Sequence, residues 1–188
     1  LNSQPMGFYS PSQLVQDAQR HGIEVRPVDI AISGWESTLE ELHDTTRQPA
    51  VRLGLSLQRG MSREAAARIE DARAIRPFEN VADLARRAGL DRGDLQVLAG
   101  ANALRSLAGH RREALWQAVG GVPDKDLLRP TTLEEEMPVL AAPSEGDEIV
   151  GDYRAQGLTL GRHPLALLRK PLLAQRFMPA SVLNLYAD

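Results

Sequence analysis

The middle of the chain is divided into short segments by residues that start or end helices, and this division limits the folds open to it. Ser62, Asn80 and Asp91 are typical of the position before a helix, and Gly89 and Gly100 are typical of helix ends. Between them, alanine, leucine and isoleucine recur at the three-and-four spacing of one helix face. The sequence therefore predicts a mainly α fold. We expect helices at residues 62–74, 81–88, 92–99 and 111–119.

The first part of the chain predicts one helix and a small β-sheet. Ser10 followed by Pro11 is typical of a helix start, and Gly22 marks the end of that helix. Residues 23–28 alternate apolar and polar and contain a proline that cannot donate a ladder hydrogen bond, so they predict a short edge strand. Two more short extended segments are expected at residues 35–39 and 50–53.

The composition limits the class of protein. With 188 residues and 43% hydrophobic content, the chain can bury one full core or two small ones. No apolar run approaches the roughly 20 residues of a membrane helix, and no signal peptide is visible, so we expect a cytoplasmic protein. The absence of cysteine and the spacing of the four histidines exclude disulfides, structural zinc and iron–sulfur clusters. Because the chain starts with Leu1, we expect it to be a segment of a larger protein.

The charges are distributed unevenly. The net charge of −3 argues against a nucleic-acid ligand, but residues 52–112 carry twelve arginines against seven acidic residues. Residues 113–152 hold ten acidic residues against two basic ones, and residues 153–178 hold five basic residues and no acidic one. A basic surface over the central helices is therefore compatible with an acidic chain.

The most informative stretch has the pattern of a helix-hairpin-helix element: a glycine, an apolar residue and a serine, followed by an alanine-rich helix. Gly60 can adopt the backbone angles that a tight hairpin needs, and Met61 is expected to anchor the hairpin in the core. The free N–H groups at the start of the helix after Ser62 would face outward, where the helix dipole favours a phosphate oxygen. Arg59 and Arg63 flank this point and would add charge-assisted contacts.

A second, weaker hairpin follows at residues 84–101. Paired hairpins can hold both strands of a duplex through phosphate contacts, so DNA would be bound without reading its sequence. The same pattern also occurs in ordinary connections between helices, so alone it leaves a purely structural role open. The predicted DNA contacts are Arg59, Gly60, Met61, Ser62, Arg63, Gly89, Arg92 and Gly93.

The residues after the hairpins differ in composition. Proline, glycine and acidic residues are frequent up to residue 146, which is typical of a linker, and a helix at residues 147–156 and a short one at 163–169 are expected after it. The predicted organisation is a helix with strands at residues 1–52, a tandem helix-hairpin-helix module at 53–120, an acidic linker at 121–146 and a C-terminal helical segment at 147–188.

Stretches outside the hairpins point to a family. Residues 1–9 have the sequence LNSQPMGFY, residues 111–116 RREALW and residues 152–165 DYRAQGLTLGRHPL. With the hairpins between them, these stretches resemble the region between the fingers and the end of the tandem hairpins in bacterial C-family DNA polymerases, the type of the DNA polymerase III α-subunit. The resemblance covers essentially the whole chain and is strongest to the error-prone ImuC-type branch.

This resemblance implies a segment that holds duplex or primer-template DNA behind a polymerase active site, in damage-induced mutagenesis and translesion synthesis. The family's nucleotidyl transfer uses palm-domain carboxylates that bind Mg²⁺ upstream of this region, and its OB-fold follows this region. We therefore expect no catalytic residue, metal or cofactor in this chain. Residues 127–142 contain no sliding-clamp peptide of the replicative kind, so the resemblance implies recruitment through the partner protein ImuB, and through it the clamp.

Two other interpretations remain open. Hairpins of this kind also occur in DNA repair glycosylases, and residues 121–125 superficially resemble the segment that carries their catalytic aspartate. Asp124 lies about sixty residues after Gly60, however, which is too far for the hairpin helix to present it. Alternatively, the hairpins are structural, and the linker or the final segment docks onto a partner protein, as the net negative charge would favour.

Overall fold

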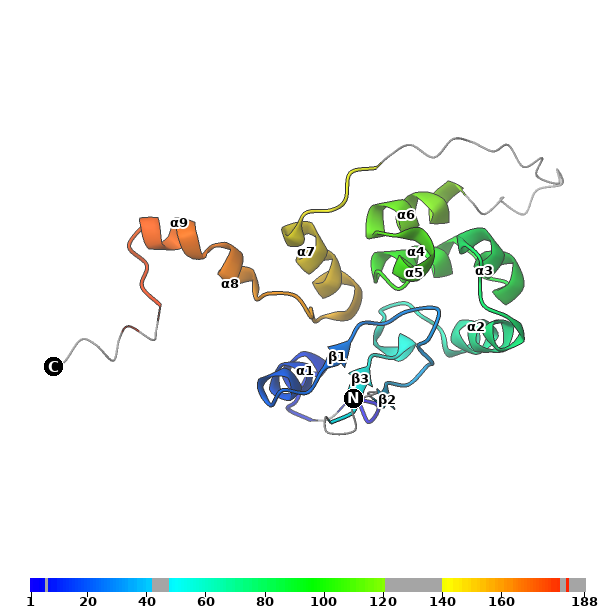
Figure 1. Ribbon diagram of the computed structural model, residues 1–188, viewed down its shortest axis with the longest axis horizontal. Coiled ribbons are helices and arrows are strands. Elements are labelled where there is room, and N and C mark those ends of the chain that lie inside the picture. Colours follow the sequence, from blue (N-terminus) through cyan, green and yellow to red (C-terminus); the bar gives the residue numbers. More distant parts are fainter. Residues whose placement is uncertain (6, 42–47, 121–139, 180–181, 183–188) are drawn as a thin grey trace.

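Helices form most of the structure, and a small sheet lies near the N-terminus (Figure 1). The computed structural model describes residues 1–5, 7–41, 48–120, 140–179 and 182. The predicted fold class, mainly α with a small N-terminal sheet, is confirmed. In chain order the elements are α1 (Pro11–Arg20), β1 (Val25–Arg26), β2 (Thr38–Glu40), β3 (Ala50–Arg52), the 3-10 turn η1 (Leu55–Leu57), α2 (Arg63–Ile75), α3 (Val81–Ala88), α4 (Arg92–Gly100), α5 (Arg105–Ala108), α6 (Arg111–Gly120), α7 (Glu145–Gln156), α8 (Pro164–Leu167) and α9 (Arg169–Ala174).

Strand β3 is the centre of the described sheet. It pairs in parallel with β1, where Val25 lies opposite Val51, and antiparallel with β2, where Leu39 lies opposite Val51. β1 is thus an edge strand, as the sequence predicted, but it is shorter than the expected residues 23–28 and ends before Pro27. α1 packs beside β1, and Ser10 caps its first turn.

The central helices start and end close to the predicted positions. The side chain of Ser62 accepts the N–H of Ala65 at the start of α2, and the side chain of Asn80 accepts the N–H of Asp83 at the start of α3. Gly89, with a φ of +58°, ends α3. Three short elements were not predicted, η1, α5 and α9. Each lasts one to two turns, and none has a side-chain cap.

The main core joins the N-terminal region to the helices. Val28 and Ile30, which follow β1, belong to the same buried cluster as Ile69 of α2 and Leu95 of α4. The N–H of Ile30 also donates to the carbonyl of Ala103 at 2.8 Å. The sheet region is therefore packed directly on the helices that carry the hairpins, while the domain boundary expected at residue 52 stays a prediction.

Helix α7 lies against α4 and α6, and α8 and α9 extend away from the body of the protein (Figure 1). α7 begins at Glu145, two residues before the predicted start, because Ser144 caps it by accepting the N–H of Asp147. Of the predicted linker at residues 121–146, positions 121–139 lie outside the described residues. In the part of the chain that the structure describes, no helix is long and apolar enough to cross a membrane.

Candidate nucleic-acid interface

Hairpin 1, defined here as residues 58–62, joins η1 to α2 through a glycine with a left-handed backbone. Gly60 has a φ of +91°, and a Cβ at this position would lie 3.2 Å from Cγ2 of Val97. Met61 is 8% exposed and belongs to the main core, so it anchors the hairpin as the sequence predicted. Ser62 is exposed and caps α2. The turn between the two elements is therefore fixed from inside and open on its outer side.

The start of α2 presents main-chain N–H groups to solvent. Among the described residues, none accepts a hydrogen bond from the N–H of Gly60, Ser62 or Arg63, and all three residues are exposed. α2 is 13 residues long, so the partial positive charge of its dipole lies at this end. These N–H groups can bind an anionic oxygen without any rearrangement of the hairpin.

The side chain of Arg63 lies next to these N–H groups. It is exposed, and within the described ranges it makes no hydrogen bond and no ion pair. Glu64 follows it in the first turn of α2 and is also exposed, so its carboxylate reduces the local positive potential. Arg63 nevertheless keeps all its donors available to a ligand.

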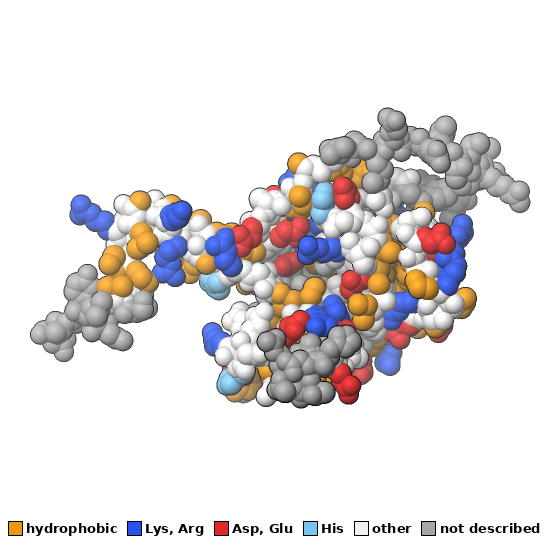
Figure 2. Space-filling model, viewed as in Figure 1, with side chains coloured by type: hydrophobic (Ala, Val, Ile, Leu, Met, Phe, Trp, Pro, Cys, Tyr) orange, Lys and Arg blue, Asp and Glu red, His pale blue; other side chains and the backbone are white. Residues whose placement is uncertain are grey.

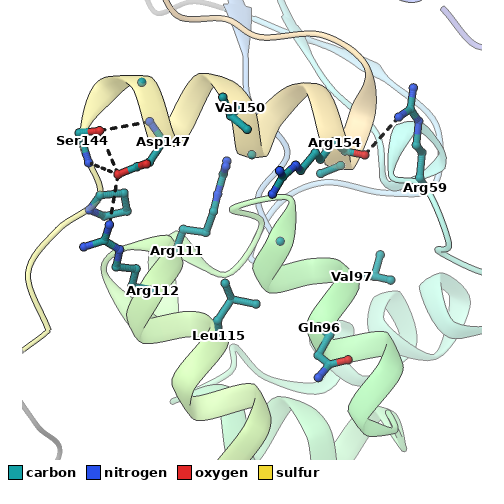
Figure 3. Close-up of a pocket in the computed structure, with 15 residues that line it drawn as sticks. Arg59, Gln96, Val97, Arg111, Arg112, Leu115, Ser144, Asp147, Val150 and Arg154 are labelled. Atoms are coloured by element: carbon teal, nitrogen blue, oxygen red, sulfur yellow. Dashed lines mark hydrogen bonds and ion pairs between the residues drawn. The ribbon is translucent and has the colours of Figure 1, made fainter.

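Arg59, at the other end of the turn, is bound to α7 (Figure 3). Its Nη1 donates to the carbonyls of Tyr153 and Arg154, each at 3.3 Å, and its main-chain N–H donates to the carbonyl of Ala155 at 2.8 Å. These carbonyls belong to the last turn of α7, where the helix dipole favours a cation. The structure thus places the guanidinium of Arg59 at a helix end, and its predicted contact with phosphate stays a prediction.

Hairpin 2, defined as residues 89–91, repeats this backbone between α3 and α4. Gly89 again has a positive φ, and Leu90 is 5% exposed in the main core. Asp91 then caps α4 by accepting the N–H of Asp94 at 2.8 Å. The structure therefore contains the tandem hairpins that the sequence predicted.

The charges around hairpin 2 differ from those around hairpin 1. Asp94 accepts the N–H of Asp91 at 3.3 Å, so two carboxylates lie at the start of α4. Arg92 points to α6, where it donates to the carbonyl of Val119 at 2.6 Å. Gly93 lies in the same first turn. A Cβ added at Gly93 would lie 3.2 Å from a carboxylate oxygen of Asp91. Arg68 lies 3.7 Å from the carboxylate of Asp94 and offsets part of this charge. Two carboxylates at the start of α4 still make it less favourable for an anion than the start of α2, and the contacts predicted for hairpin 2 stay predictions.

Several arginines of the basic central block bind groups inside the protein. Arg68 donates to the carbonyl of Ala88 at 2.8 Å, at the end of α3. Arg87 donates to the carbonyls of Ala72 and Arg76, at the end of α2. The arginine content of residues 52–112 therefore overstates the positive charge that a ligand can meet.

A groove of about 810 Å³ beside hairpin 1 is lined by residues of α4, α6 and α7 (Figure 3). Arg154 lines it from α7 and Gln96 from α4. Hydrogen bonds from the side chain and the N–H of Ser144 lower the pKa of Asp147, and the nearby guanidinium of Arg112 acts in the same direction. Sequence reasoning missed Arg154, because only the docking of α7 brings it to hairpin 1.

Comparison with known proteins agrees with this geometry. A family described as "Helix-hairpin-helix motif" matches residues 22–114. The chain is 58% identical over 189 residues to the error-prone DNA polymerase of Bordetella parapertussis, a match that covers 100% of this chain. The error-prone DNA polymerases of Burkholderia pseudomallei and Azoarcus sp. are 56% and 54% identical over 98% and 97% of the chain.

The chain belongs to the error-prone DNA polymerase family. It spans 18% of the length of each of these three relatives, so it matches one segment of them. Within the described residues, no group of three or more His, Cys, Asp or Glu side chains could hold a metal ion. Residues 121–125, which superficially resemble the segment with the catalytic aspartate of glycosylases, lie outside the described residues.

Proposed function

We propose that this segment of an error-prone DNA polymerase binds the phosphate backbone of duplex or primer-template DNA without reading its sequence. Hairpin 1 makes the main contact, through the N–H groups of Gly60, Ser62 and Arg63, and the guanidinium of Arg63 adds a charge-assisted hydrogen bond. Hairpin 2 contributes less, because Asp91 and Asp94 lie at the start of its second helix.

The open start of α2 is the observation that carries this proposal. The main-chain N–H groups of Gly60, Ser62 and Arg63 have no acceptor among the described residues, and Met61 holds the turn in place from the core. A phosphate could therefore reach the N–H groups without displacing a side chain or breaking a hydrogen bond. The match to the helix-hairpin-helix family and the similarity to error-prone DNA polymerases support the same role. Because phosphates are common to all sequences, such binding would not depend on the bases.

In the intact polymerase, this segment would hold DNA behind the active site during translesion synthesis in damage-induced mutagenesis. The catalytic carboxylates and Mg²⁺ would be held by other parts of the polymerase, so this chain alone would not extend a primer. ImuB, and through it the sliding clamp, are the protein partners we propose, and the cytoplasm is the proposed location.

A second candidate function is docking to a partner protein such as ImuB or the sliding clamp, with structural hairpins. The arm formed by residues 164–178 has exposed apolar side chains: Leu165 is 54% exposed, Leu168 50% and Phe177 60%. Figure 2 shows Lys and Arg side chains among the hydrophobic ones on this arm. An acidic partner with an apolar face would suit this surface.

The salt dependence of DNA binding distinguishes the two functions. The binding constant of the 188-residue chain is measured for two duplexes of unrelated sequence while the salt concentration is raised. Phosphate contacts predict equal affinity for both duplexes and a slope of log K against log salt of about −0.9 per contact. Binding to only one of the duplexes would refute the proposal. A flat salt response would also refute it, and would leave docking as the better account.

A further inference from the structure

Arg59 of hairpin 1 binds the last turn of α7, and we call this contact the joint. The joint gives Arg59 and Arg154 different roles. We infer that Arg59 is a positioning residue that does not contact DNA, and that Arg154, which this joint holds beside hairpin 1, is the second cation that binds phosphate. This inference rests on the proposed function, since it names which side chains of the same surface meet the DNA backbone.

One nitrogen of the Arg59 guanidinium and the main-chain N–H of Arg59 are engaged at a helix end. Nη1 is shared between the carbonyls of Tyr153 and Arg154, and the main-chain N–H is bound to the carbonyl of Ala155. If the guanidinium turned toward a phosphate, these carbonyls at the end of α7 would lose a charged donor that also complements the helix dipole. Gly157 makes room for it, because a Cβ there would lie 3.0 Å from Nη2 of Arg59.

A second contact strengthens the joint. Gln58, which is 3% exposed, donates from Nε2 to the side-chain oxygen of Gln156 at 3.2 Å. Two successive residues of hairpin 1 are therefore bound to four successive residues of α7, positions 153–156. Because these bonds involve both main-chain and side-chain groups, the end of α7 and the turn of hairpin 1 are fixed relative to each other.

Arg154 differs from Arg59 in its side-chain contacts. Both arginines are exposed, but in the described part of the chain Arg154 makes no side-chain hydrogen bond and no ion pair. It lines the groove that borders hairpin 1, and Figure 3 shows it reaching into this groove while Arg59 lies beyond the end of the helix. Gln96, on the opposite wall, adds a polar side chain. A DNA backbone held at hairpin 1 and entering the groove would meet Arg154.

A double-mutant cycle on the 188-residue chain tests this assignment. R154A should lower the affinity for duplex DNA about tenfold near 0.1 M salt and reduce the salt slope by about one unit, the effect of one lost phosphate contact. R59A should cause a similar loss, since Arg154 is no longer held in place. The double variant R59A/R154A should bind no more weakly than R59A. R63A/R154A should show additive losses of about a hundredfold in total.

Two further measurements separate positioning from contact. Hydrogen exchange at the amide of Gly157, which donates to the carbonyl of Tyr153 at 3.1 Å, should become faster in R59A and stay unchanged in R154A. R59K, which keeps a cation at the end of α7, should recover most of the affinity. R20A is the control, because Arg20 is an exposed arginine at the end of α1 whose side chain makes no hydrogen bond and no ion pair among the described residues.

The outcomes are distinct. Additive losses in R59A and R154A, each with its own change in slope, would make Arg59 a direct phosphate ligand and overturn the inference. If R154A binds DNA as tightly as R20A, Arg154 is not part of the DNA-binding surface. If the wild-type chain shows no salt dependence, the proposed function fails, and the role of Arg154 fails with it. The exchange rate at Gly157 would still decide whether Arg59 positions α7.

Discussion

Gly151 of α7 leaves the space that the guanidinium of Arg111 occupies, since a Cβ at position 151 would lie 1.4 Å from Nη1 of that arginine. Arg111 is 6% exposed, and it donates to the carboxylate of Asp152 and to the carbonyl of Glu148. Ile149 is the one buried residue of α7. α7 is therefore held on the hairpin module mainly by arginines, and its position should be sensitive to changes around them.

The variant G151A should displace the guanidinium of Arg111 and break its pairing with Asp152. We expect the free energy of unfolding to fall by about 2–3 kcal/mol, because overpacking and a buried charge without its partner both destabilise. Urea unfolding measures this loss. The matched control is G146A in the same helix, where the nearest atoms lie 3.8 and 4.0 Å from the added Cβ. It should be neutral or stabilising by up to about 1 kcal/mol, and equal effects of the two variants would contradict the account.

The stability of the protein should depend on pH through Asp83. This side chain, 3% exposed, is paired with Arg76, Arg86 and Arg87. Burial raises its pKa, but hydrogen bonds from Arg87, from the N–H of Glu79 and from Arg76 outweigh burial and lower the pKa from 3.8 to about 2. Because the pKa is lower in the folded state, the stabilisation is complete above about pH 4 and is lost as the pH falls toward 2.

Urea unfolding between pH 6 and pH 2 measures this effect. The wild-type midpoint should decrease as the pH falls through this range, and D83N should be less stable at pH 6 and show a smaller decrease. A decrease of the same size in D83N would assign the acid sensitivity to other carboxylates.

Arg92 provides a test of hairpin 2. Its guanidinium donates to the carbonyl of Val119 at the end of α6, and Arg92 itself is exposed. R92A should therefore lower the free energy of unfolding by roughly 0.5–1 kcal/mol, the usual contribution of one hydrogen bond. Its salt slope for DNA binding should equal that of the wild type. A slope reduced by about one unit would show that Arg92 reaches a phosphate and that hairpin 2 binds DNA as directly as hairpin 1.

Much of the fold could be predicted because helix caps are local signals. Ser10, Ser62, Asn80 and Asp91 each accept a hydrogen bond from an N–H three residues later, and each precedes a helix expected from the sequence. η1, α5 and α9 were missed for the same reason, since they are short and lack a capping side chain. The hairpin turns were recognised from their glycines, which have positive φ angles at Gly60 and Gly89.

The roles of the arginines could not be predicted in this way. The carbonyl of Tyr153 lies 94 residues from Arg59, and that of Val119 lies 27 residues from Arg92. Neither contact leaves a periodic or local pattern in the sequence. An arginine beside a hairpin glycine was therefore expected to bind phosphate. When two helices pack together, however, the same side chain can donate to the last carbonyls of the neighbouring helix.

The salt dependence of duplex DNA binding by R63A tests the central claim most directly. Arg63 is the exposed arginine at the start of α2, and R20A removes an exposed arginine at the end of α1 as a control. We predict that R63A reduces the slope of log K against log salt by about one unit and the affinity about tenfold near 0.1 M salt, while R20A matches the wild type. If R63A binds duplex DNA with the wild-type slope and affinity, hairpin 1 does not hold a phosphate.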